Sequence, residues 1–249
     1  MIDSYVLLGS QNSGRRGVIA NCIEMALSES NIAILISESE IESESEKNIS
    51  KFPNAKILKY KDTQDAKEKF LSLSADDIEF VFYVADSNQN VIDELEFLKN
   101  LNESNIIRIV RIWALVDCKL FLDNFEKMSP YYDALSHFCD CMLLSNRADL
   151  KGSQIEEILK RYKKLCHPHL IVYVKKDFKC DNPAILLVDE ARRITMAFDA
   201  YDPVDELDLD EDNLPEEPFD LSKKEDPYFV RFENGMRSKT VPLINTFLK

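Results

Sequence analysis

The chain has 249 residues, of which 45% are hydrophobic and 31% charged, a composition typical of a globular protein with a buried core rather than of a disordered one. Its formal net charge is −14, but ten of the 45 acidic residues lie within residues 202–220, which contain no Lys or Arg. Nothing in this balance resembles the clustered positive charge of a nucleic-acid binder. Without a secretion signal or an apolar run of roughly 20 residues, we expect a cytoplasmic protein with no membrane contact.

Apolar runs rich in β-branched and aromatic residues alternate with segments of helical spacing. The predicted strands are Tyr5–Leu8, Ile32–Ile36, Phe80–Ala85, Ile106–Val116, Met142–Leu144 and Leu170–Val174. The predicted helices are 16–29, 63–73, 91–101, 119–138 and 154–166. This alternation predicts an α/β fold with a mostly parallel sheet and helices on both faces. A ligand site is then expected at the carboxyl ends of the strands.

The pattern changes after about residue 190. We predict a domain at 1–190 and a C-terminal extension at 191–249, in which the acidic residues 202–220 form a solvated linker. Two further strand candidates lie in this region, Arg193–Phe198 and Tyr228–Phe232. The glutamate-rich stretch Glu38–Glu46 is predicted to be a solvated, flexible loop, because a strand would bring its like charges together on one face.

One motif follows the first strand. The chain has only five glycines, yet three of them, Gly9, Gly14 and Gly17, fall within nine residues. The segment Gly9–Arg16 has the spacing of the phosphate-binding pattern G-x-x-x-x-G-K-[ST]. We take its candidate phosphate-binding residues to be Gly9, Asn12, Ser13, Gly14, Arg15 and Arg16. An ordinary glycine-rich turn between a strand and a helix remains the alternative.

Arginine stands at both of the motif's chemically specialised positions. Glycines let main-chain N–H groups and a helix N-terminus converge on phosphate oxygens, and this property survives the substitutions. Arg15, at the lysine position, could supply positive charge to the outer phosphates. Arg16, at the Ser/Thr position, cannot ligate a cation, so the sequence argues against Mg²⁺ binding there.

A second motif follows the predicted strand Met142–Leu144. Asn146, Arg147 and Asp149 fit the pattern N-K-x-D with arginine in place of lysine. A carboxylate at Asp149 would accept from guanine N–H groups, Asn146 would contact the other edge of the base, and Arg147 could cover its face. Taken alone, the same residues are also compatible with a helix-capping turn.

With both motifs in place, residues 3–190 resemble the CobW-type family of P-loop GTPases, which is related to HypB and UreG. The order of further segments agrees with that family, notably Ile34–Glu40, Tyr83–Gln89, Val116–Phe121 and Asn182–Leu187. The resemblance implies a GTPase fold, GTP or GDP as ligand, and Mg²⁺ as cofactor. The family's C-x-C-C metal motif is absent, and Gln89 replaces the glycine that senses the γ-phosphate. We identify no metal-ligand set and no catalytic residue.

These departures favour a pseudo-GTPase, a CobW-like protein that binds GTP or GDP and hydrolyses little. One alternative is a nucleotide-free interaction or scaffold protein that retains the fold and meets a partner, or a second copy of itself, through the C-terminal extension. A second alternative is an active GTPase in metal-centre or cofactor assembly.

Overall fold

The computed structural model describes residues 1–199 and 225–248. Within them the chain forms a seven-stranded parallel sheet in the order β3-β2-β4-β1-β5-β6-β7. The strands are β1 (Ile2–Leu8), β2 (Ile32–Ser37), β3 (Ala55–Tyr60), β4 (Phe80–Val84), β5 (Ile107–Asp117), β6 (Cys141–Ser145) and β7 (Leu170–Tyr173). The α/β prediction with a largely parallel sheet is confirmed.

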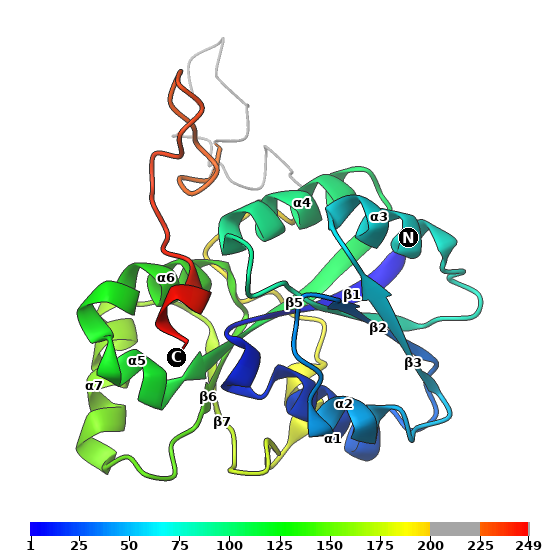
Figure 1. The fold of residues 1–249 in the computed structure, drawn as a ribbon, viewed down its shortest axis with the longest axis horizontal. Helices are drawn as coiled ribbons and strands as arrows, with labels where there is room; N and C mark the ends of the chain where they lie inside the picture. The colour runs from blue at the N-terminus through cyan, green and yellow to red at the C-terminus, as the bar shows by residue number, and fades with distance from the viewer. Residues whose placement is uncertain (200–224, 249) are drawn as a thin grey trace, which may run out of the picture.

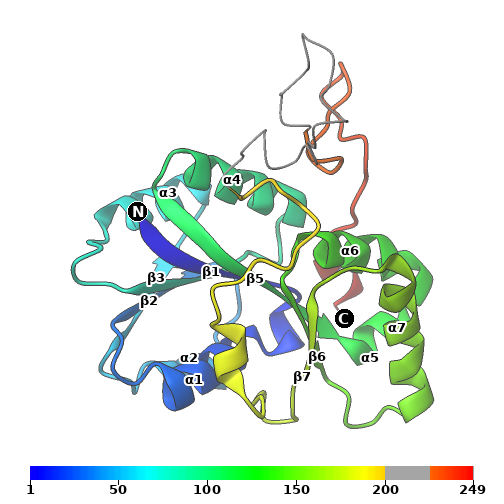
Figure 2. The same cartoon turned by 180° about the vertical axis from the view of Figure 1, so that it is seen from behind.

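Helices cover both faces of this sheet (Figures 1 and 2). They are α1 (Arg15–Ala26), α2 (Glu44–Ile49), α3 (Thr63–Ser72), α4 (Val91–Glu103), α5 (Cys118–Asp123), α6 (Phe125–Phe138) and α7 (Gly152–Leu165). One apolar core lies between the sheet and α3, α4, α6 and α7, and the other lies between the sheet and α1. Since both faces are buried, the central strands are almost continuously apolar, which made them readable in the sequence.

Two elements escaped the sequence prediction. Strand β3 lies at the edge of the sheet, and exposed Lys56 interrupts its apolar pattern, a common feature of edge strands that discourages pairing with other molecules. Helix α2 falls partly within the glutamate-rich stretch, and its N-cap Ser43 accepts a hydrogen bond from the main-chain N–H of Glu46. The predicted helix 119–138 is in fact two helices, because Asn124 leaves the helical conformation and separates α5 from α6.

Neither strand candidate in the C-terminal region is a strand. The N–H groups of Ile194 and Thr195 both donate to the carbonyl oxygen of His137 at the end of α6, so this segment caps a helix instead of joining the sheet. Residues 227–229 form a turn, and the bridge that follows, between Arg231 and Arg237, is isolated from the sheet.

Residues 225–248 pack against the folded body. The Asp226 carboxylate accepts from the Thr195 hydroxyl at 2.6 Å and lies 2.7 Å from Nε2 of His137, and these contacts hold its pKa below the usual range despite its burial. Arg237 pairs with Asp93 and Glu96 on α4. The segment ends in a short 3-10 helix (Ile244–Phe247), drawn in red beside α6 in Figure 1. The acidic residues 202–220 lie outside the described residues.

Candidate functional site

The glycine-rich loop joins the end of β1 to the start of α1. Gly9 has φ of +130°, and a Cβ there would lie 2.6 Å from the carbonyl oxygen of Leu115 on β5. Gly14 has φ of +91°, a left-handed conformation that side chains rarely adopt. Between them Gln11–Ser13 form one 3-10 turn, in which the Ser13 hydroxyl donates to the carbonyl of Ser10. The glycine spacing therefore reflects local backbone requirements of this loop.

Helix α1 begins at this loop without a side-chain cap. Its N-cap is Gly14, and the first N–H groups of an α-helix have no partners within the helix. Such a terminus attracts anions through these N–H groups and through the helix dipole. A cavity of about 200 Å³ opens here, lined by Gln11, Asn12, Gly14, Arg15, Arg16, Gly17, Ser43, Ser45 and Phe178.

The two arginines are buried and paired within the protein. Arg15 donates from Nη1 to the carbonyl of Ala85 and from Nη2 to Oε1 of Glu40, both at 2.5 Å. Arg16 donates from Nη1 to Oε2 of Glu46 at 2.6 Å, and its Nη2 lies 3.4 Å from Oε2 of Glu40. The solvated loop predicted for Glu38–Glu46 is therefore wrong for its two buried members, because burial of two guanidinium groups requires carboxylate partners.

The loop after β4 closes this side of the site. Asp86 accepts hydrogen bonds from the hydroxyls of Ser37 and Ser39, each at 2.8 Å, and from the main-chain N–H of Asn88. The main-chain N–H of Ser87 donates to Oε1 of Glu40 at 3.1 Å. Three segments, the ends of β2 and β4 and the start of α1, are thereby joined through carboxylates.

These residues do not suit Mg²⁺. Arg16 occupies the place where a hydroxyl ligand would be expected, and Asp86 is already engaged by two hydroxyl groups and one N–H group. Two other carboxylates of this site, Glu40 and Glu46, neutralise the arginines. Mg²⁺ requires oxygen ligands in near-octahedral geometry, and these side chains do not supply them.

The second motif lies at the same edge of the sheet and touches the first. Asn146, with φ of +51°, donates from Nδ2 to the carbonyl of Asn12 at 3.1 Å and to Oδ2 of Asp117 at 2.6 Å. Asp117, at the end of β5, also caps α5 by accepting from the N–H of Leu120. The turn after β6 is thus attached to the glycine-rich loop, a contact that a helix-capping turn alone would not need.

The other two residues of this motif, Arg147 and Asp149, do not share the surroundings of Asn146. Arg147 is held against β7: its guanidinium donates to the carbonyls of Leu144 and Val174 and lies 4.5 Å from the ring centroid of Tyr173. Asp149 is exposed and forms no side-chain hydrogen bond within the described part of the chain. Its carboxylate is available to a ligand, whereas Arg147 offers one side of a flat, partly buried group.

Sequence reasoning missed Phe178, which comes from the loop after β7. A Cβ at Gly14 would lie 2.0 Å from its ring and a Cβ at Gly17 would lie 2.4 Å from its Cβ, so Phe178 packs directly on both glycines. Its own φ is +60°. The one available signal was an aromatic residue isolated in the polar turn Lys175–Lys179.

The C-terminal segment also reaches this edge. Val241 and Ile244 are buried, and Asn245 donates to the side-chain oxygen of Asn88 at 3.4 Å. Phe247 and Leu248 line a cavity of about 700 Å³ together with Asn12, Asp117, Lys119, Leu120, Asp123, Asn124 and Asn146. The chain's own terminus therefore forms part of the wall beside both motifs.

A buried carboxyl group, Glu94, lies behind the loop after β4. Its Oε2 accepts from the Tyr83 hydroxyl at 2.7 Å and from the N–H of Asp86 at 3.3 Å. Burial raises the pKa of Glu94 to about 7, although the hydrogen bonds from Tyr83 and Asp86 oppose that shift.

This shift predicts a pH dependence of stability. The folded protein holds the Glu94 proton at pH values where the unfolded chain has lost it, so the contribution is full below about pH 4.5 and is lost as pH rises through about 7. Relative to Glu94→Gln, we expect the free energy of unfolding of the wild type to fall by on the order of 3 kcal/mol between pH 4.5 and 8. Urea denaturation of both proteins across this range measures it, and parallel pH profiles would contradict the prediction.

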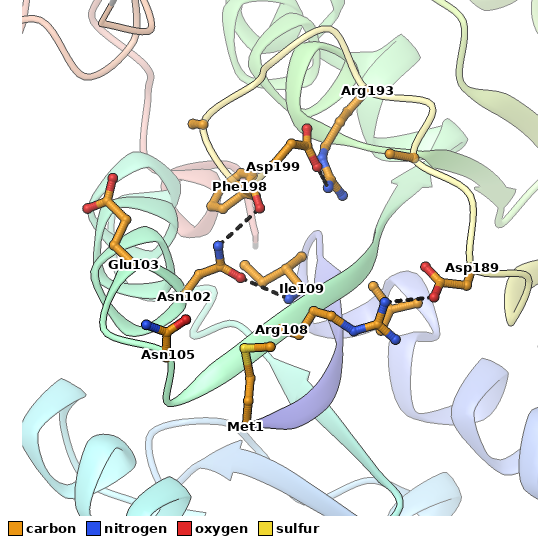
Figure 3. Close-up of a pocket in the computed structure, with 13 residues that line it drawn as sticks. Met1, Asn102, Glu103, Asn105, Arg108, Ile109, Asp189, Arg193, Phe198 and Asp199 are labelled. Atoms are coloured by element: carbon orange, nitrogen blue, oxygen red, sulfur yellow. Dashed lines mark hydrogen bonds and ion pairs between the residues drawn. The ribbon is translucent and has the colours of Figure 1, made fainter. Parts of the chain in front are cut away.

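Another cavity, of about 550 Å³, lies at the opposite edge of the sheet, between the end of α4 and the starts of β1 and β5 (Figure 3). Its arginines are already neutralised. Arg108 pairs with Asp3 and Asp189, and Arg193 pairs with Asp140 and also with Asp199. Ligands of parallel α/β sheets bind at the carboxyl ends of the strands. The end of the sheet that carries the glycine-rich loop is therefore the better candidate site.

No helix within residues 1–199 and 225–248 is both long and apolar enough to cross a membrane. In the same ranges, no three His, Cys, Asp or Glu side chains are grouped so that they could hold a metal ion. The six cysteines, all described, are free thiols.

The parallel sheet, with a glycine-rich loop leading from β1 into α1, defines the fold of a P-loop NTPase. The chain has a fold like that of the hydrogenase maturation factor HypB from Archaeoglobus fulgidus, with a TM-score of 0.51 and 13% identity over 70% of this chain and 81% of HypB. It is equally similar to the zinc-bound YjiA GTPase from E. coli, with a TM-score of 0.52 and 15% identity over 76% of this chain.

The receptor FtsY from Elizabethkingia anophelis, in complex with GDP, matches with a TM-score of 0.51 and 12% identity over 81% of this chain. The chain spans 61% of YjiA and 65% of FtsY. No protein-family model matches the sequence, and no curated protein matches it either. Identities this low establish the fold alone. That fold is the one that the resemblance to CobW-type and HypB-like GTPases implied.

Proposed function

We propose that this protein is a pseudo-GTPase that binds GTP or GDP without Mg²⁺ and hydrolyses little. The observation that carries the proposal is the pairing of Arg15 and Arg16 with Glu40 and Glu46 beside an uncapped helix N-terminus. The loop keeps its main-chain donors for phosphate, while both cations that would assist phosphoryl transfer are used elsewhere.

The ligand would bridge the two motifs. Its inner phosphates would meet the N–H groups at Gly14 and the first turn of α1. Its base would lie at the turn after β6, where Asp149 is free to accept from guanine and Asn146 is already attached to the loop through Asn12. The fold that the chain shares with HypB, YjiA and the GDP complex of FtsY supports a guanine nucleotide.

Hydrolysis needs charge neutralisation at the outer phosphate and an oriented water molecule. Gln89 replaces the sensing glycine, Arg16 replaces the hydroxyl ligand, and Asp86 is engaged by Ser37 and Ser39. For these reasons the proposal assigns no catalytic residue and no resident metal.

Titration with a fluorescent guanine nucleotide tests the proposal. We expect saturable binding that EDTA does not weaken, and no GTP turnover above the rate of the uncatalysed reaction. Loss of binding in EDTA would contradict the Mg²⁺-free mode. GTP turnover clearly above the uncatalysed rate would instead support an active GTPase, the second alternative, in metal-centre or cofactor assembly.

The other alternative, a nucleotide-free interaction protein, is favoured by exposed apolar side chains in the C-terminal extension. Phe232, Met236 and Leu243 of the C-terminal extension are 56%, 62% and 39% exposed, and such apolar side chains suit a protein partner or a second copy of this chain. Absence of guanine-nucleotide binding up to millimolar concentration in the same titration would establish this alternative over the first.

We also propose how the chain is divided and where the protein is located. We place the nucleotide-binding unit at residues 1–190 and treat 191–249 as an extension, in which the acidic linker 202–220 connects residues that pack on the body. Free thiols at all six cysteines support a cytoplasmic location, since reducing compartments keep thiols unpaired.

A further inference from the structure

The Glu40 carboxylate lies fully buried at the centre of the candidate site. Its Oε1 accepts from Nη2 of Arg15 at 2.5 Å and from the main-chain N–H of Ser87 at 3.1 Å, and its Oε2 lies 3.4 Å from Nη2 of Arg16. The side chain has an exposed fraction of 0%. One anionic group is therefore held by a guanidinium at the lysine position and by an N–H group of the loop after β4.

These two donors are those that an outer phosphate would need. In P-loop proteins the glycine-rich backbone cradles the inner phosphates, and the residue at the lysine position reaches the β- and γ-phosphates. Arg15 occupies that position, but its guanidinium is divided between Glu40 and the carbonyl of Ala85. We infer that Glu40 is an internal substitute for the terminal phosphate and makes the site select a nucleoside diphosphate over the triphosphate.

Electrostatics supports this selection. A third phosphate would bring a second anion beside a buried carboxylate, whereas the inner phosphates face the uncapped N-terminus of α1 and the 200 Å³ cavity. Like charges a few ångströms apart in a protein environment repel by more than the free energy of a tenfold change in affinity. Glu40 thus penalises only the outermost phosphate.

Glu40 is also held firmly enough to resist displacement. Arg16, the second cation beside it, is fixed by Glu46 at 2.6 Å and by the carbonyl of Ile41 at 2.8 Å. Nearby, Ser37 and Ser39 attach the end of β2 to Asp86. A γ-phosphate would have to break this set of buried contacts to reach Arg15.

The inference rests on the proposed function and is tested by comparing GMP, GDP and GTP in EDTA. We expect the wild type to bind GDP at least about tenfold more tightly than GTP. Glu40→Gln, which keeps the shape and removes the charge, should narrow the ratio to within about threefold by tightening GTP. Glu38→Gln, an exposed glutamate two residues away, is the matched control and should leave the ratio unchanged.

The outcomes separate the two claims. GTP bound as tightly as GDP by the wild type would overturn the role of Glu40 and leave the proposed function standing. A GDP preference that Glu40→Gln leaves intact would also overturn it, because charge at this position would then not be the cause. If no guanine nucleotide binds the wild type, the proposed function fails and the inference fails with it. Because the wild-type ratio needs no variant, a misfolded Glu40→Gln protein would not remove the test.

Discussion

Arg15→Ala is expected to lower the free energy of unfolding by about 3–5 kcal/mol, because it leaves the Glu40 carboxylate buried without its main partner. Arg15 is 1% exposed and Glu40 is fully buried at the side chain. Removing one member of such a pair strands the other charge, whereas removing both does not. Total stabilities are about 5–15 kcal/mol, so this single change would take a large share. Chemical denaturation followed by circular dichroism measures it.

The chain offers a matched control for this prediction. Arg161 pairs with Asp133 at the same 2.5 Å separation, but the two side chains are 33% and 26% exposed. Arg161→Ala should therefore cost clearly less than Arg15→Ala, because water still reaches this pair. The double variant Arg15→Met with Glu40→Gln should lose clearly less free energy of unfolding than Arg15→Met and Glu40→Gln lose singly when their losses are added. Equal effects of Arg15→Ala and Arg161→Ala would show that burial does not control the strength of this pair.

The pair of Arg15 and Glu40 shows which feature of the site could not be predicted from the sequence. Glu40 and Glu46 look in the sequence like members of a solvated run of glutamates, alternating with Glu38, Glu42 and Glu44. Their partners lie 24 to 30 residues earlier in the chain, and only the parallel pairing of β2 with β4 beside β1 brings them together. No local pattern distinguishes a carboxylate that will be buried from one that will remain in water.

Features set by local requirements were predictable. The central strands are buried on both faces, so their apolar runs show them, and the glycines of the loop stand where φ is positive or a neighbour approaches closely. Strand β3 was missed because an edge strand has a weaker apolar pattern. The nine site residues selected from the two motifs all lie at the carboxyl edge of the sheet, as parallel topology requires. Whether they bind nucleotide stays a prediction.

Phe178 shows a second feature that the sequence could not reveal. Its loop is distant in sequence from the glycine-rich loop, yet its contact determines which side chains the glycine positions tolerate. Gly17→Ala should lower the free energy of unfolding by about 2–3 kcal/mol, since its Cβ would lie 2.4 Å from Cβ of Phe178, an atom fixed close to the backbone. Gly17 lies in the first turn of α1 without a positive φ, so alanine brings no backbone strain there. The expected loss of stability is therefore due to the clash with Phe178 alone.

Removal of the aromatic side chain should separate clash from backbone strain. In a Phe178→Gly background, where the Cβ and the ring are both gone, we expect Gly17→Ala to lose most of its cost, with a helix-propensity gain of up to about 1 kcal/mol in its favour. Gly14→Ala should remain costly in that background, because its φ of +91° strains any side chain whatever the space. Gly152→Ala, at the start of α7 with no atom within 4 Å of the added Cβ, is the neutral control. If Gly14→Ala recovered as fully as Gly17→Ala, the loop would not need its left-handed glycine, and the backbone explanation for the motif's spacing would be wrong.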